Sequence, residues 1–136
     1  MQKHTILIID DDCRELDIMN NVLYDAGYQV LVAEDGEIGY RRAVFARPDL
    51  ILLDVMMPGK NGYETCKLLK GNKHTRNIPI FFKTCKGDGK SILDGYRAGI
   101  DRFITKPCNH DELLRLVKSR LASVQQDHLQ THLQLL

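Results

Sequence analysis

Short apolar runs alternate along the chain with segments whose apolar residues recur at helical spacing. Five such pairs can be drawn, and this alternation is typical of parallel strands joined by crossover helices. Runs that are apolar at every position, such as residues 6–9 and 50–53, indicate central strands covered on both faces. The pattern predicts an α/β fold with a doubly wound, five-stranded parallel sheet, in short (βα)5.

Capping and turn residues delimit these elements. The predicted strands cover residues 6–9, 28–32, 50–53, 78–82 and 103–105. The first helix is predicted to begin at the N-cap Asp12, with Glu15 completing a capping box, and to end at Gly27. Asn109 and Glu112 repeat the capping pattern before the last helix. The three helices between are predicted around residues 36–45, 63–69 and 92–98.

The C-terminal tail has two interpretations. Residues 1–122 are expected to form one domain, and residues 123–136 either extend the last helix or form a flexible tail. Leu129, Leu133 and Leu136 would share one helical face, which another chain could cover. His128 and His132 are spaced for a metal on a helix, but no third ligand is near in the sequence.

Composition limits the class of protein. The 136 residues, 43% hydrophobic and 27% charged, are enough for one compact domain. The 19 basic and 18 acidic residues nearly cancel, so charge favours neither nucleic acid nor an anionic membrane as partner. The N-terminus resembles neither a signal peptide nor a membrane span, which predicts a cytoplasmic protein. The four separated cysteines are expected to be free thiols in a reducing compartment, since they form no Cys-x-x-Cys pair.

The residues that end the predicted strands are chemically complementary. Asp10 and Asp11 follow the first strand, Asp54 the third, Thr84 the fourth and Lys106 the fifth. In an open parallel sheet the ligand site lies beyond the carboxyl ends of the strands. A lone Asp there is usually a turn or cap residue. Several complementary groups in one crevice instead indicate a site.

Close carboxylates repel one another unless a cation neutralises them. Oxygen ligands favour a hard ion such as Mg²⁺, which keeps part of its coordination open to phosphate. The carboxylate of Asp54 could then act as nucleophile toward a phosphoryl group and form an acyl phosphate. Thr84 would donate a hydrogen bond to the phosphoryl oxygens, and Lys106 would pair with them.

The motifs resemble those of response-regulator receiver domains of two-component systems, and in particular those of single-domain chemotaxis regulators. The matching residues are the acidic pair after residues 6–9, the stretch 53–59 with Gly62, Thr84, and Lys106 with Pro107. The resemblance covers roughly residues 4–122. It implies the flavodoxin-like strand order 2-1-3-4-5.

The resemblance also implies roles for the site residues. Asp54 would be the phosphoacceptor. Asp11, Asp54 and the backbone carbonyl of Met56 would bind Mg²⁺ directly, and Asp10 would act through water. Met56 and Lys86 occupy positions that tune dephosphorylation in the family.

Further positions match the switch of the family. Thr84 and Phe103 match the pair in which the hydroxyl turns toward the phosphoryl group and the aromatic ring moves inward. Lys106 matches the phosphate-pairing lysine, and its bond to Pro107 is expected to be cis. Lys83 departs from the pattern, because an apolar residue usually precedes the threonine. Cys85 and Cys108 are further departures.

The implied partners are a sensor histidine kinase or phosphotransfer protein as donor and a downstream effector protein. The effector, or a second copy in a homodimer, would bind the surface of the fourth helix, fifth strand and fifth helix; the C-terminal tail is a second route to a dimer. Such a protein catalyses only its own phosphorylation and dephosphorylation. Neither membrane contact nor direct binding of nucleic acid by this chain is expected, since it ends soon after the receiver.

Three alternatives remain at this stage. An aspartyl phosphatase would need a second acid where Met56 stands. A flavin-binding protein would need a phosphate cradle after the first strand, where residues 10–12 are all aspartate. An inactive pseudo-receiver is disfavoured because every functional position is filled.

Overall fold

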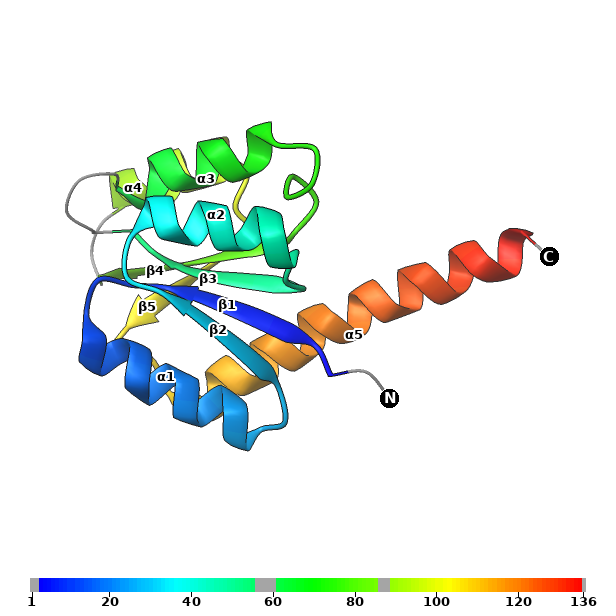
Figure 1. Ribbon diagram of the computed structural model, residues 1–136, viewed down its shortest axis with the longest axis horizontal. Coiled ribbons are helices and arrows are strands. Elements are labelled where there is room, and N and C mark those ends of the chain that lie inside the picture. Colours follow the sequence, from blue (N-terminus) through cyan, green and yellow to red (C-terminus); the bar gives the residue numbers. More distant parts are fainter. Residues whose placement is uncertain (1–2, 56–60, 86–88, 136) are drawn as a thin grey trace.

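The computed structural model describes residues 3–55, 61–85 and 89–135. Its five strands form one parallel sheet in the order β2-β1-β3-β4-β5 (Figure 1). In chain order the strands are β1 Thr5–Ile9, β2 Gln29–Ala33, β3 Leu50–Asp54, β4 Ile80–Cys85 and β5 Arg102–Lys106. The predicted α/β fold and the strand order implied by the resemblance are both confirmed.

Helices cover both faces of the sheet. They are α1 Cys13–Asp25, α2 Gly36–Ala46, α3 Gly62–Gly71, α4 Gly89–Ala98 and α5 His110–Leu135. Helices α1 and α5 lie on one face, and α2, α3 and α4 lie on the other (Figure 1). Since parallel strands need long crossovers, the helices alternate with the strands along the chain.

The core consists of two apolar layers separated by the sheet. Side chains of successive residues in a strand point to opposite faces. In β1, Leu7 and Ile9 therefore pack in the layer beneath α2 and α3, and Ile6 and Ile8 pack in the layer with α1 and α5. All four are fully buried. Continuous burial explains why residues 6–9 of β1 are all apolar.

Local signals in the sequence define most helix ends. The Asp12 side chain accepts hydrogen bonds from the backbone N–H groups of Arg14 and Glu15 at the start of α1. Gly27 follows the end of α1 with φ of 100°, and Gly99 follows α4 with φ of 96°. These left-handed conformations favour glycine. The predicted N-cap at Asp12 and the predicted helix end at Gly27 are confirmed.

The start of β4 differs from the prediction. The strand begins at Ile80 rather than at residue 78. The Ile78 N–H donates to the carbonyl of Thr75 at 3.0 Å within a turn, and Pro79 has no N–H to offer the sheet. The hydrophobic pattern could not distinguish this buried turn residue from the strand behind it.

The last helix is longer than the sheet that it covers. Helix α5 runs from His110 to Leu135, and its C-terminal part projects beyond the body of the domain (Figure 1). Leu113, Val117 and Leu121 anchor its first half in the core. The division of the chain at residue 122 stays a prediction. Within the described ranges, no helix combines the length and apolar character needed to cross a bilayer.

Candidate functional site

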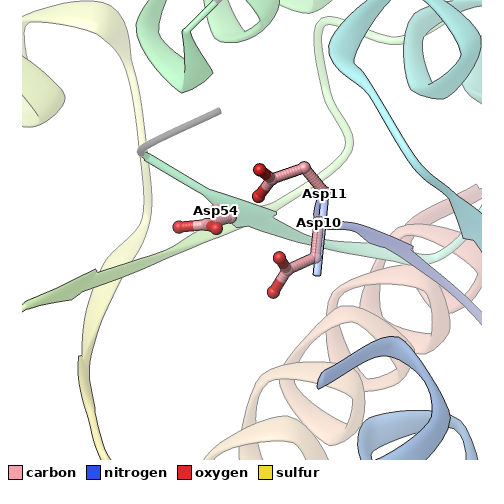
Figure 2. A group of neighbouring side chains, drawn as sticks. All are labelled: Asp10, Asp11 and Asp54. Carbon is pink, nitrogen blue, oxygen red and sulfur yellow. The ribbon is translucent and has the colours of Figure 1, made fainter. Parts of the chain in front are cut away.

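Three carboxylates meet at the carboxyl edge of the sheet. Asp10 and Asp11 follow β1, and Asp54 is the last residue of β3 (Figure 2). One oxygen from each side chain lies within 4.8 Å of the others. Asp10 is fully buried and Asp54 is 4% exposed, whereas Asp11 is exposed. The arrangement is thus a half-open acid cluster with Asp11 toward solvent.

Lys106, the last residue of β5, faces this cluster. Its Nζ atom lies 3.0 Å from Oδ1 of Asp54 and 4.0 Å from Oδ2 of Asp10. Burial alone would lower the pKa of Lys106, but its hydrogen bond to Asp54 and the attraction of the nearby carboxylates outweigh burial and raise that pKa. Lys106 therefore stays an ammonium group. The peptide bond to Pro107 is cis, as the resemblance implied.

Asp10 is the most constrained member of the cluster. Its Oδ1 atom accepts a hydrogen bond from the Asp12 N–H at 3.0 Å, whereas its buried Oδ2 atom has no hydrogen-bond partner among the described residues. Burial, followed by repulsion from Asp54, raises the pKa of Asp10; the Asp12 N–H and the two nearby lysines oppose this without cancelling it. A negative charge on Asp10 is therefore costly in the protein without a bound cation.

A second lysine lies beneath the cluster. Lys83 in β4 is 1% exposed at its side chain, and its Nζ atom is 2.7 Å from Oε1 of Glu15 and 3.7 Å from Oδ2 of Asp10. The predicted capping box of α1 is therefore wrong in its second half. Glu15 pairs with Lys83, and the Asp12 N–H donates to Asp10 instead. The sequence marked Lys83 only as a departure, since its partner Glu15 is 68 residues away.

Thr84 and Phe103 lie on adjacent strands. Thr84 in β4 is 5% exposed. The Phe103 ring in β5 packs edge-on against Phe82 at a centroid distance of 5.8 Å and against Tyr96 of α4 at 5.3 Å. A Cβ atom on Gly95 would lie 2.4 Å from the tip of the Phe103 ring. The ring thus occupies a notch in α4 that exists because residue 95 is glycine.

Gly62 explains one feature of the sequence motif. This residue begins α3, and an added Cβ atom would lie 2.5 Å from the Asp54 carbonyl oxygen and 2.8 Å from Cα of Val55. Backbone cannot yield to such a contact as a flexible side chain can. Helix α3 can therefore approach the end of β3 this closely only with glycine at position 62.

The structure does not place two candidate site residues or the side chain of one residue that departs from the family pattern. Met56 and Lys86 lie outside the described residues, as does the side chain of Cys85. The other cysteines, Cys13, Cys66 and Cys108, are free thiols, as expected. Burial raises the pKa of Cys66 to about 11, so this core thiol stays neutral around neutral pH.

Comparison with known proteins identifies the family. The model of the response regulator receiver domain matches residues 6–118. The chain belongs to this family. The receiver is a signalling switch of two-component systems, rather than a member of the aspartyl phosphatase or flavin-binding classes considered above.

Two curated relatives are full-length regulators. This receiver is 39% identical over 116 residues to the DNA-binding dual master transcriptional regulator RpaA of Synechocystis, covering 85% of this chain and 48% of RpaA. It is also 39% identical over 117 residues to the phosphate regulon transcriptional regulatory protein PhoB of Pseudomonas aeruginosa, covering 86% and 51%. The chain thus spans about half the length of these relatives.

Solved structures agree with the fold and the acid cluster. The receiver superposes on chemotaxis protein CheY4 of Vibrio cholerae with a TM-score of 0.83 at 29% identity, over 87% of this chain and 98% of that one. The receiver domain of a sensor histidine kinase from Pseudomonas aeruginosa, with a magnesium ion coordinated in its active site cleft, gives 0.82 at 25% identity, over 89% and 99%. Receiver domains bind Mg²⁺ at an acidic pocket, and this chain has an acidic cluster formed by Asp10, Asp11 and Asp54.

Proposed function

We propose that Asp54 is the phosphoacceptor of this receiver and takes its phosphoryl group from a phosphohistidine of a sensor histidine kinase or phosphotransfer protein. The observation that carries the proposal is the cluster itself. Asp10, Asp11 and Asp54 offer oxygens within 4.8 Å of one another, and the Lys106 ammonium group lies 3.0 Å from Asp54. Negative charge is gathered at one sheet edge beside a fixed positive group.

Each residue would have a separate role in the transfer. One carboxylate oxygen of Asp54 attacks the phosphorus, the O–P bond forms as the N–P bond of the donor breaks, and imidazole leaves. Lys106 then moves its ion pair from the carboxylate to the phosphoryl oxygens, and the Thr84 hydroxyl donates a hydrogen bond to them. The role of Asp54 as nucleophile is favoured by its central position between Lys106 and the acid pair.

The donor set fits Mg²⁺. Asp11, Asp54 and the Met56 carbonyl would hold the ion directly, and Asp10 would hold it through water. The buried Oδ2 atom of Asp10, which has no hydrogen-bond partner among the described residues, supports this assignment because a coordinated water would satisfy it. When bound, the ion offsets the negative charge that would otherwise repel an incoming phosphoryl group.

The output would pass through Thr84 and Phe103 to the surface formed by α4, β5 and α5. Phe103 contacts Tyr96, and Tyr96 and Leu93 expose about half of their surface on α4. A reorientation of Phe103 would therefore change an apolar patch that an effector protein or a second copy of the chain can bind. Met56 and Lys86 would set the lifetime of the phosphorylated form.

Phosphorylation can be tested with a small-molecule donor. The purified protein is incubated with acetyl phosphate and Mg²⁺, and intact mass is measured. We expect the mass of one phosphoryl group to be added to the wild type but not to Asp54→Asn. The control is Asp17→Asn, at an exposed aspartate of α1, which should be labelled like the wild type. Equal labelling of Asp54→Asn would overturn the assignment. If only Asp54→Asn stays unlabelled, phosphotransfer profiling against histidine kinases would identify the natural donor.

A further inference from the structure

Lys83 is a charged residue at a buried strand position where an apolar residue would be expected. It lies in β4, next to Asp54 of β3 in the sheet register, and is among the largest fully buried side chains of the described residues. An ammonium group that is buried without partners is strongly unfavourable. The groups that surround Lys83 must therefore account for its presence.

Two carboxylates lie near the Lys83 ammonium group, at unequal distances from its Nζ atom. Glu15 of α1 binds it at 2.7 Å, whereas Oδ2 of Asp10 is 3.7 Å away, beyond hydrogen-bonding distance. The Glu15 side chain is 30% exposed, so it reaches the buried lysine from the rim of the site. Glu15 thus holds Lys83 back from Asp10, and the Asp10 oxygen is left without a hydrogen bond.

We propose that Lys83 and Glu15 are a positioning pair that sets how strongly the acid cluster attracts a divalent cation. The inference rests on the proposed Mg²⁺ site and extends it to two residues that do not contact the ion. The Lys83 ammonium group opposes cation binding through its charge beside Asp10. Glu15 counters this, both by its own charge and by keeping Lys83 from donating a hydrogen bond to Asp10.

The two members of the pair are predicted to have opposite effects. In Glu15→Gln, Lys83 loses its close partner and can turn to Oδ2 of Asp10, so Mg²⁺ must compete with a buried ammonium group. In Lys83→Met, most of the side-chain length is kept but the positive charge is lost, so the negative charges of Asp10 and Glu15 are less compensated. Mg²⁺ affinity should fall in the first variant and rise in the second, each by on the order of three- to tenfold.

The test is isothermal titration of Mg²⁺ into the wild type, the two single variants and the double variant. The double variant, Lys83→Met with Glu15→Gln, removes both charges and should return the dissociation constant to within about threefold of the wild type. Glu37→Gln is the matched control, because Glu37 forms an exposed ion pair with Arg41 on α2. Its Mg²⁺ affinity should not change.

Urea unfolding in the absence of Mg²⁺ measures how far each substitution destabilises the fold, so that this effect can be compared with its effect on Mg²⁺ affinity. Breaking a buried pair destabilises the protein whichever partner is removed. A purely structural role would therefore weaken Mg²⁺ binding in both single variants or in neither. Such a result, with a wild type that binds Mg²⁺, would overturn the inference and leave the proposed site intact. A wild type without Mg²⁺ affinity would instead overturn the site itself.

The comparison does not depend on a stable Lys83→Met protein. If that variant does not fold, Glu15→Gln and the double variant still differ only at Lys83, and the pair in the double variant is neutral. Tighter Mg²⁺ binding by the double variant than by Glu15→Gln supports the role of Lys83. Equal affinities of these two proteins would contradict it.

Discussion

The body of the sheet buries apolar side chains, whereas its carboxyl edge buries several polar and charged ones. In β1 and β3 the body consists of fully buried apolar residues that touch only one another and the helices. One residue further along, burial continues with Asp10, Asp54, Lys83 and Thr84, none more than 5% exposed. The body is stable because it excludes water. The edge holds charges that water would otherwise solvate.

This contrast separates stability from function within one sheet. Burial of apolar surface stabilises the fold, whereas burial of Asp10 next to Asp54 works against it. The neighbouring lysines offset only part of that cost. Substitutions in the body should therefore destabilise the protein, and some substitutions at the edge should stabilise it while abolishing function.

The largest effect is expected in the body. Phe82 is fully buried, and its ring packs edge-on against Tyr63 at 5.2 Å. Phe82→Ala should lower the free energy of unfolding by about 3–5 kcal/mol, because it leaves a cavity between the sheet and α3. Urea unfolding followed by circular dichroism measures this. A loss below about 1 kcal/mol would contradict the packing described here.

Gly62→Ala tests the junction between body and edge. Its new Cβ atom would meet the backbone of Asp54 and Val55, so we expect a loss of about 2 kcal/mol and altered amide shifts at both residues in NMR spectra. Gly71→Ala at the other end of α3 is the control, since no atom lies within 4 Å of its added Cβ. Because alanine favours a helix more than glycine does, Gly71→Ala should not lose stability. Similar losses in both variants would therefore show that the contact with Asp54 is not responsible.

Asp10→Asn should stabilise the protein in the absence of Mg²⁺ by about 1–2 kcal/mol, because burial and the nearby Asp54 make the negative charge of Asp10 unfavourable despite the two lysines. The raised pKa of Asp10 means that the folded protein binds its proton more tightly than the unfolded chain does. This carboxyl group therefore contributes stability that is lost as pH rises from 3.8 through the folded pKa. The advantage of Asp10→Asn should accordingly grow from acidic to neutral pH in urea unfolding. An asparagine variant less stable at neutral pH would refute this account of the edge.

The smallest effect is expected at an exposed pair. Glu37 and Arg41 on α2 are 2.8 Å apart, with side chains 59% and 74% exposed. Glu37→Gln should change the free energy of unfolding by less than about 0.5 kcal/mol, because water screens the pair. Thermal and urea unfolding of this variant set the baseline for the buried pair of Lys83 and Glu15. A loss above about 1 kcal/mol would remove the contrast between exposed and buried pairs.

Local chemistry made most of the fold predictable. The order of elements followed from alternating apolar runs, and Asp12 and Gly27 marked the ends of α1 through preferences that act within a few residues. The proximity of Asp10 to Asp54 was also predictable, because the carboxyl ends of neighbouring parallel strands share one edge. These features depend on the chain near each residue or on the topology alone.

The partner of Lys83 was not predictable from the sequence. The three-residue spacing of Asp12 and Glu15 suggested a local hydrogen bond, but a tertiary ion pair with β4 took its place. Ile78 similarly has the apolar character of a strand residue and yet lies in a turn. The first error arises where a contact distant in sequence outweighs a local preference. The second arises because a local turn and Pro79 delay the start of the strand.

The projecting part of α5 can amplify small movements of the domain. The segment after Leu121, which anchors the helix in the core, continues as helix to Leu135 and reaches about 20 Å at 1.5 Å per residue. Tilting a rod of that length by about 10° displaces its tip by roughly 3–4 Å. A small rearrangement where α5 meets the sheet would thus be magnified at a distance from the acid cluster.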